Sequence, residues 1–457
     1  MLSPYEFYRD ENVRKRILEY CSDAVYMVGY GEKESSLEKF KSVQKSEFNW
    51  ILDNELDAFR SNWDNSSTLA VFDIEYFNID FHAEIFLKPY ETYLKLEPVY
   101  RNLMKIFSKY GITPLVLMTG QGYHFSMRVP FADPVHKKLE TMSKICNSVA
   151  GKYNSVSGRR KQKVPINHGI AFETTGRLIE YIGHQLIREL KNQNTIPLVF
   201  TDVAVGTGKK GREAISLDIS MYGDPLFMRD IRCAFSVYQK HKVKKWLYGD
   251  HISKTVPYLI AIPRKPSDKL RDLIKLRTNY ENAAKRASEI STLIPDASAG
   301  IDGIIAEYSL SKICNFHKDF DAVQSHEPYQ WQGTYDMFDM RLLPPCVRGP
   351  LEQPNDLLLK PTNIQTVVRI LMKMGWHPKH IAGLLRSKFE RDYKWGGTWM
   401  KYDAQSRANF YVRMFAGLII DGLDNEIDLN CISHGQKDYC VKPSGCEFNL
   451  ANYKLTS

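Results

Sequence analysis

Hydrophobic and polar positions alternate along the first half of the chain with the periods of helices and strands. Amphipathic spacing predicts helices at 3–22, 36–61, 91–110, 134–152 and 173–195. Short apolar stretches next to turn residues predict strands at 24–31, 69–77 and 214–220 and a hairpin across 114–129. Helices and strands that alternate in this way indicate an α/β or α+β fold.

The second half of the chain has a mainly helical pattern. Residues 266–313 predict helices with a break around 296–305, and further helices are predicted at 362–375, 377–391 and 403–420. We therefore expect an α+β fold with a mixed sheet flanked by helices at 1–265, interrupted by a basic insert at 151–213. A helical connector at 266–334 and a mainly α-helical domain at 335–457 are expected to follow.

The composition is that of a soluble globular protein with a mild basic excess. Of the 457 residues, 43% are hydrophobic and 25% are charged, and the formal net charge is +9. This charge suits a polyanionic partner, although many soluble enzymes are equally basic. No apolar run approaches the roughly 20 residues that span a bilayer, and the N-terminus has no apolar signal core. We expect a cytoplasmic protein, nucleoid-associated if it is prokaryotic, that does not contact membranes.

Three acidic residues emerge from predicted strands. In the segment LAVFDIEYF, Asp73 and Glu75 are two positions apart, so their side chains lie on the same face of the strand. Two such carboxylates repel each other unless a cation lies between them; the alternative is an edge strand with two solvated acids. Asp218 follows a further apolar–polar alternation, AISLDIS. Together these acids fit a two-metal site for Mg²⁺ or Mn²⁺, which prefer carboxylate oxygens.

A glycine-containing turn and a basic stretch supply groups that suit a triphosphate. The turn lies between two predicted strands and consists of Thr119, Gly120, Gln121 and Gly122. Its backbone can approach a ligand closely, and His124 can donate to a phosphate, although a core histidine is the alternative. Downstream, Arg232, Lys240 and Lys242 would neutralise triphosphate charge. These parts together indicate nucleotidyl transfer.

The segments FDIE, TGQGYHF and SLDIS, in this order, resemble the motif signature of the archaeo-eukaryotic primase superfamily. The resemblance covers residues 4–245 apart from the basic insert. It implies that Asp73, Glu75 and Asp218 hold the metal ions and that the turn, His124 and the segment DIRCAFSVYQKHK hold a nucleoside triphosphate. In that segment the implied contacts are Arg232, Ser236, Lys240 and Lys242. Tyr238 occupies a position where catalytic subunits of replicative primases usually have histidine.

Four of the eight cysteines fall in the last quarter of the chain, at Cys346, Cys431, Cys440 and Cys446. In a reducing compartment such a set favours metal or iron–sulfur ligation over disulfides. One distant cysteine and three close ones resemble the iron–sulfur domain of the primase large subunit, which implies a [4Fe–4S] cluster. Two alternatives are that the four cysteines bind zinc and that they bind no metal. His434 is either a spare ligand or a loop histidine. In that family this domain contacts the template, for which Lys360, Arg369, Arg386 and Lys388 are candidates.

The combined pattern predicts a single-chain primase-polymerase. It would synthesise short primers de novo from nucleoside triphosphates on a single-stranded DNA template. A repair polymerase of the same superfamily that only extends primers, and a non-catalytic DNA-binding replication initiator, are the alternatives. Both primase halves on one chain suggest a mobile element, and a replicative helicase or polymerase is left open as a further partner.

Overall fold

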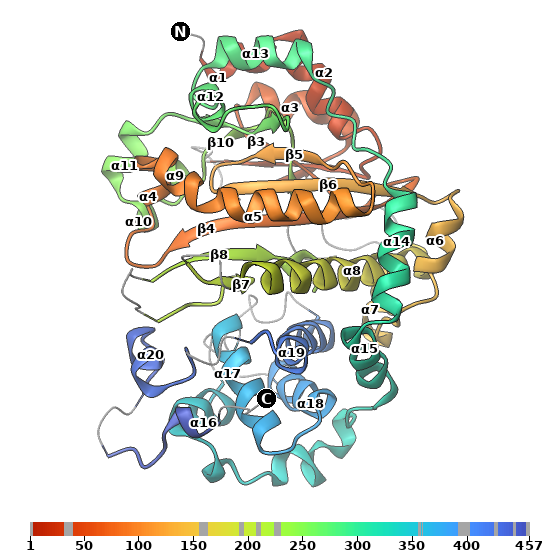
Figure 1. Cartoon of the computed structure of the whole chain (residues 1–457), viewed down its shortest axis with the longest axis vertical. Helices are drawn as coiled ribbons and strands as arrows, with labels where there is room; N and C mark the ends of the chain where they lie inside the picture. Colours follow the sequence, from red (N-terminus) through yellow and green to blue (C-terminus); the bar gives the residue numbers. More distant parts are fainter. Residues whose placement is uncertain are drawn as a thin grey trace.

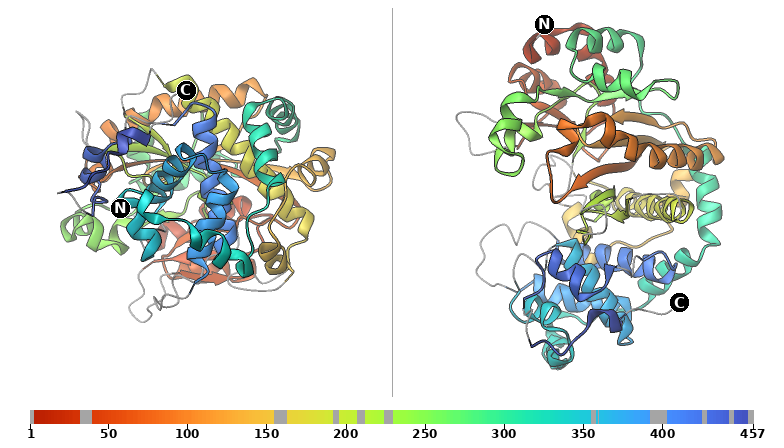
Figure 2. Two further views of the ribbon diagram at one scale, coloured as in Figure 1. Left: turned by 90° about the horizontal axis from the view of Figure 1, so that it is seen from below. Right: turned by 60° about the vertical axis from the view of Figure 1, so that its left-hand side comes forward.

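The computed structural model describes residues 3–31, 40–154, 163–191, 196–206, 212–223, 230–354, 358, 360–391, 403–424, 428–441 and 445–453. Within these residues the chain has the predicted α+β fold, in which a mixed sheet flanked by helices is followed by a helical C-terminal part (Figure 1). The N-terminal and C-terminal helices lie at opposite ends of the long axis (Figure 2).

A six-stranded sheet forms the centre of the N-terminal half. Across the sheet the strands are β12 (Ile262–Arg264), β5 (Leu115–Met118), β6 (Gly122–Pro130), β4 (Ser67–Asn78), β8 (Glu213–Asp218) and β7 (Leu198–Phe200). Neighbouring strands are antiparallel except β7 and β8, which run parallel. The long strand β4 lies in the middle and is flanked by β6 and β8, so residues of both neighbours lie beside it.

Two long helices, α5 (Pro89–Lys109) and α8 (Ile166–Leu190), pack side by side across one face of this sheet (Figure 1). The apolar stripe of α5 is fully buried at Tyr93, Leu96, Leu103 and Phe107, which recur at helical spacing. After its C-cap, Gly111 adopts a φ of +69°, the left-handed conformation in which glycine commonly ends a helix.

A second sheet, which is four-stranded and antiparallel, lies in the same region as the N-terminal helices. Its order is β2 (Phe40–Val43), β1 (Met27–Tyr30), β3 (Asp57–Arg60) and β9 (Ile231–Arg232). The helices of this region are α1 (Pro4–Arg9), α2 (Glu11–Tyr20), α3 (Phe48–Asp53), α12 (Leu270–Leu276) and α13 (Tyr280–Glu289). Near the end of β4 lie short elements, namely α4 (Glu84–Leu87), β10 (Val237–Tyr238), α9 (Lys240–Val243), α10 (Lys245–Tyr248), α11 (Asp250–Thr255) and β11 (Leu259–Ile260).

The chain then descends along one side of the molecule into the C-terminal helices (Figure 1). The descending helices are α14 (Ser298–Ser309) and α15 (Lys312–Ala322), beside α6 (Pro134–Leu139) and α7 (Asn147–Tyr153). The C-terminal helices are α16 (Pro345–Glu352), α17 (Pro361–Lys373), α18 (Pro378–Phe389), α19 (Ala404–Ile420) and α20 (Cys431–Gln436). None of the helices in the described segments has the length and apolar character needed to cross a bilayer.

The predicted helix at 36–61 is wrong for the described residues from 40 onward. This stretch forms β2, α3 and β3, because β1 pairs with β2 on one side and β3 on the other. The backbone hydrogen bonds of this sheet outweigh a weak helical periodicity. Residues 36–39 lie outside the described part of the chain.

Other boundaries in the predicted helical segments also differ from those observed. The helix at 3–22 divides at Asp10, whose carboxylate accepts hydrogen bonds from the backbone N–H groups of Asn12 and Val13 and so starts a second helix. The helix at 134–152 divides into α6 and α7. The break expected around 296–305 lies earlier, since α14 covers most of that range and Ala297 bonds instead to the Arg128 carbonyl of β6.

Candidate active site

The pairing of β4 with its two neighbours brings the predicted carboxylates and the histidine together. Asp73 lies opposite His124 of β6 on one side and opposite Asp218 of β8 on the other. Glu75 lies two residues further along β4, opposite Gly122 and Ser216, and therefore on the same face as Asp73. Three segments that are distant in sequence thus meet at one place on the sheet.

These side chains form two groups with the spacing of metal ligands. In one group, ligand atoms of Asp73, Glu75 and His124 lie within 4.8 Å of one another; in the other, those of Glu75, Asp202 and Asp218 do. Nε2 of His124 is 3.3 Å from Oδ2 of Asp73. Carboxylate oxygens are the ligands that Mg²⁺ and Mn²⁺ prefer, and Glu75 is common to both groups, as in sites where one carboxylate bridges two ions.

Asp202 is a candidate ligand that the sequence reasoning missed. It follows β7, whose parallel pairing with β8 brings this residue next to Asp218. Thr201, which lies between the end of β7 and Asp202, has a φ of +57°, a left-handed conformation that is uncommon for threonine. Its carbonyl accepts a hydrogen bond from Ser216 Oγ at 2.8 Å. The sequence does carry a signal, because LVF is followed, after Thr201, by an acid and so approximates the apolar-then-acidic pattern of β4, but it fell within the expected basic insert.

The turn between β5 and β6 packs against β4 without space for side chains. A Cβ on Gly122 would lie 1.7 Å from the carbonyl oxygen of Ile74, and a Cβ on Gly120 would lie 2.2 Å from the ring of Tyr238. The backbone N–H of Thr119 donates to the Gly122 carbonyl at 2.9 Å and closes the turn. Glycine is therefore required at both positions by close approach of neighbouring groups.

Gln121 links this turn to the short helices beyond β10. Its Oε1 accepts hydrogen bonds from the hydroxyl of Tyr238 at 2.9 Å and from Nζ of Lys240 at 2.5 Å. Burial raises the pKa of Tyr248, and nearby Glu75 adds to this rise while Lys240 opposes it. Lys240 therefore places a positive charge at the turn, and Tyr248 lies within electrostatic reach of both Lys240 and Glu75.

Three other residues predicted to contact the triphosphate are held by the fold itself. Arg232 is buried, pairs with Asp57 at 2.7 Å, and lies between the rings of Phe59 and Tyr238. Ser236 is fully buried, and its hydroxyl accepts from the Ala58 backbone N–H and donates to the Val237 carbonyl.

Lys242 is the third, and it points away from the turn. Its ammonium donates to the backbone carbonyls of Ser253 and Val256 at 2.6 and 2.8 Å. These contacts lie at the end of α11, whereas Lys240, two residues earlier, reaches Gln121. The structure thus brings Lys240 to the turn and not Lys242.

The four C-terminal cysteines line one cavity of about 170 Å³, together with His434. Burial raises the pKa of Cys346 to about 12, and the nearby thiols of the other three cysteines contribute. In the described residues, the groups of three or more whose ligand atoms all lie within 4.8 Å are the two carboxylate groups, so no three of these sulfurs lie that close to one another. His434 is buried, which lowers its pKa to about 4.

The expected template contacts on the C-terminal helices differ in exposure. Lys360 is exposed, whereas Arg369 is buried in a two-bond ion pair with Asp424, both bonds being 2.7 Å long. Arg386 and Lys388 are also largely buried. Of the four, Lys360 alone has an exposed side chain.

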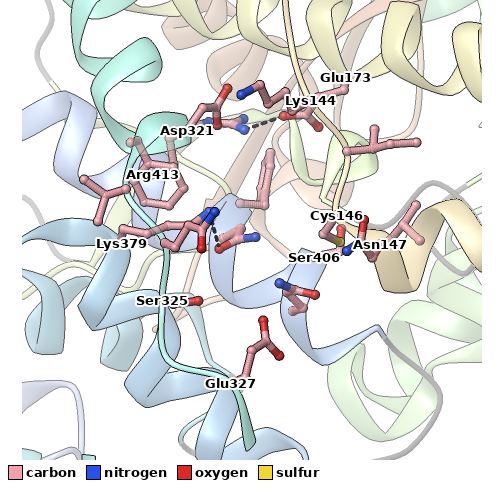
Figure 3. Close-up of a pocket in the computed structure, with 18 of the residues that line it drawn as sticks. Lys144, Cys146, Asn147, Glu173, Asp321, Ser325, Glu327, Lys379, Ser406 and Arg413 are labelled. Carbon is pink, nitrogen blue, oxygen red and sulfur yellow. Dashed lines mark hydrogen bonds and ion pairs between the residues drawn. The ribbon is translucent and has the colours of Figure 1, made fainter. Parts of the chain in front are cut away.

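A larger cavity, of about 450 Å³, lies away from the carboxylates, where α7 and α8 meet α15, α18 and α19 (Figure 3). Its charged lining is mostly paired: Arg177 binds Asp321 through two hydrogen bonds, and Arg413 pairs with Glu173. These ion pairs join the sheet-covering helix α8 to α15 and to α19. We interpret the network as the means by which the C-terminal helices are fixed to the sheet-bearing part.

Comparison with known proteins gives little further information. No family model matches the chain, and no curated protein matches it. Among solved structures, the chain resembles the polymerase domain of ligase D from Mycobacterium tuberculosis in complex with DNA, with 10% sequence identity and a TM-score of 0.34. The match covers 62% of this chain and 87% of that one. A TM-score below 0.5 does not establish a shared fold or function.

Proposed function

We propose that this chain is a DNA-dependent primase-polymerase that synthesises short primers de novo on single-stranded DNA by two-metal nucleotidyl transfer. The observation that carries the proposal is the pair of ligand groups that share Glu75 on adjacent strands. Two divalent ions about 4 Å apart are the arrangement used for in-line displacement at phosphorus. The basic excess and the lysines near the site suit a polyanionic template and a triphosphate substrate.

In this proposal Asp73, Glu75, Asp202 and Asp218 hold Mg²⁺ or Mn²⁺. Bound there, the ions would supply charge to activate a 3′-hydroxyl and to stabilise the leaving pyrophosphate. The residues of this chain would do the rest of the binding. Lys240, anchored on Gln121, would neutralise the triphosphate, and the backbone of the glycine turn would approach it closely beside His124.

Arg232 and Ser236 act on the nucleotide site indirectly in this proposal. The Arg232–Asp57 pair holds the ring of Tyr238 in place, and Tyr238 packs on Gly120 and bonds to Gln121. Tyr238 therefore occupies the position where the resemblance implies a histidine, and its side chain packs against the turn. We expect it to position the turn rather than to contact the substrate.

We further propose that Cys346, Cys431, Cys440 and Cys446 hold an iron–sulfur cluster. Their convergence on one cavity supports a shared ligand. Tetrahedral zinc with Zn–S bonds of about 2.3 Å would place sulfurs roughly 3.8 Å apart. Because no three of these sulfurs in the described residues lie within 4.8 Å of one another, we prefer a cluster, which is larger than a single ion. Metal analysis for iron and zinc, with absorbance near about 400 nm, tests this assignment. Cys346→Ser is expected to lose iron and absorbance together. Stoichiometric zinc without iron in the unchanged protein would contradict the assignment.

The experiment that tests the enzymatic proposal offers anaerobically purified protein an unprimed single-stranded DNA, Mg²⁺ or Mn²⁺ and labelled nucleoside triphosphates. Short products from the unprimed template are expected. Extension of a supplied primer without any product from the unprimed strand would instead identify a primer-extending repair polymerase. Tight DNA binding without synthesis under either condition would identify a non-catalytic initiator and overturn the proposal.

A further inference from the structure

The helix α10 exposes a tryptophan at the edge of the candidate active site. Trp246 is 77% exposed, whereas Trp63 and Trp331 are each 6% exposed. Leaving a large indole in water forfeits the stabilisation that its burial would give. An exposed tryptophan therefore suggests a partner that covers it.

The surroundings of Trp246 are strongly basic. Residues 240–254 contain five lysines and one aspartate. Lys245 is exposed beside the tryptophan, and Lys244 is half-buried. Burial lowers the pKa of Lys242, and the ammonium of Lys245 lowers it further, which shows that the lysines lie close enough to repel one another. Such a concentration of positive charge is complementary to a phosphate backbone.

The same helix fixes Trp246 relative to the carboxylates. Tyr248 lies two residues after Trp246, so the two side chains point to opposite sides of the helix. Tyr248 is 7% exposed and faces the site, because its pKa is affected, after burial, by Lys240, Glu75, Gln121 and Asp202 in turn. Trp246 therefore points outward from the wall of the site.

The helix is held firmly enough to present a fixed surface. The ring of Phe86 from α4 packs edge-on against Tyr248, with centroids 5.2 Å apart, and also lies 5.0 Å from the ring of His241. Gly249, with a φ of +91°, allows the sharp turn into α11 that follows. The group α4, α9, α10 and α11 lies at the end of β4 that carries Glu75 (Figure 1).

We propose that Trp246, with Lys244 and Lys245, forms a stacking platform for an unpaired base of single-stranded DNA beside the carboxylate site. An aromatic face flanked by cations is the combination that binds single strands without sequence preference, because every base has a π-face and every linkage a phosphate. The proposal deepens the proposed function, on which it rests, by assigning a place where the template strand leaves the site. A protein partner is the other occupant that an exposed tryptophan could serve, and the test separates the two.

The test measures equilibrium binding of a fluorescently labelled oligo-dT by the full chain in EDTA, where no synthesis takes place. Trp246→Ala is expected to weaken binding at least about fivefold, the lower end of the effect of removing one stacked base. Trp246→Phe, which keeps an aromatic face, is expected to retain most of the affinity. Leu310→Ala removes a side chain that is 88% exposed on the turn between α14 and α15 and is the matched control, expected to bind as the unchanged protein does.

A second substrate identifies stacking as the cause. An oligonucleotide of the same length without bases keeps the phosphates, so the unchanged protein and Trp246→Ala should bind it equally. If Trp246→Ala binds oligo-dT as tightly as the unchanged protein, the platform is refuted and a protein partner becomes the better explanation. If the unchanged protein makes no primers but Trp246→Ala still weakens the binding of oligo-dT, the proposed function is overturned and the stacking platform is supported.

Discussion

Asp73 on β4 and Asp218 on β8 lie directly opposite each other in antiparallel register. Their side chains are almost entirely buried, with residue exposures of 6% and 1%. Like charges that face each other across a sheet destabilise it, and burial raises the cost of each charge further. The arrangement fits a bound cation, whose charge would offset both effects.

Replacing Asp202 with asparagine tests the ligand that the structure adds. Because this side chain is exposed, the change should leave the melting temperature nearly unaltered. Loss of one charged ligand should lower the rate of synthesis roughly 100-fold, the scale of removing one electrostatic stabiliser, and raised Mn²⁺ should partly restore it. Primer synthesis at several Mn²⁺ concentrations checks this, with the exposed Glu281→Gln as the control. Full activity of Asp202→Asn would exclude it from the site.

Lys240 and Lys242 are predicted to differ although they are neighbours on α9. Lys240→Ala removes the ammonium that reaches Gln121 and should raise KM for the nucleoside triphosphate about tenfold. Lys242→Ala removes hydrogen bonds to two carbonyls at the end of α11 and should lower the free energy of unfolding by about 1 kcal/mol, with a smaller change in KM. Steady-state kinetics and urea denaturation of both variants provide the test. A larger KM effect for Lys242→Ala would reverse the assignment.

Gly122→Ala is expected to damage both stability and activity. The added methyl group would overlap the carbonyl of Ile74, so the hairpin would have to move away from β4. Such overpacking costs about 1–3 kcal/mol and would also shift His124 relative to Asp73. Gly151→Ala in α7 is the matched control: its Cβ meets nothing within 4 Å, so the change should stabilise the helix by up to about 1 kcal/mol. Equal effects of the two substitutions would contradict the close packing of the turn.

The stability of the chain should fall in mild acid because of His317. Burial lowers its folded-state pKa to about 4, while Glu180 and Arg413 lie next to it. The unfolded histidine titrates near about 6.5, so between these values the unfolded state binds the extra proton and is favoured. The contribution of His317 is thus fully present above pH 6.5 and is lost as the pH falls towards about 4.

Urea denaturation at pH 7.5 and pH 5 measures this loss. His317→Gln is expected to reduce the difference in unfolding free energy between the two pH values. It should not abolish that difference, because burial also lowers the pKa of His241 and His434 to about 4. An identical pH dependence in the variant and the unchanged protein would show that His317 is not the group responsible.

Local patterns predicted the parts of the site that lie within single strands. The spacing of Asp73 and Glu75 fixes their common face, and the glycine turn fixes the hairpin that returns His124 to Asp73. The long amphipathic helices near 91–110 and across the C-terminal part also follow directly from periodicity. In each case the information lies in neighbouring residues.

The parts that could not be predicted depend on long-range pairing or on the direction of a side chain. Asp202 reaches the site only because β7 pairs in parallel with β8, which no local pattern encodes. Arg232 is held in a buried ion pair by Asp57, a residue far away in the sequence. Lys240 and Lys242 look equivalent as a sequence, but the rotation of a one-turn helix sends one to Gln121 and the other to α11.

The measurement that tests the central claim most directly is primer synthesis by Asp73→Asn, compared with its binding to single-stranded DNA. This substitution removes a charge from the carboxylate cluster and keeps the shape of the side chain. Synthesis from the unprimed template should fall by roughly 100-fold or more, while the DNA dissociation constant stays close to that of Glu281→Gln and the melting temperature does not fall, since one of two facing charges is removed. If Asp73→Asn still makes primers at the unaltered rate, the carboxylate cluster is not the catalytic site.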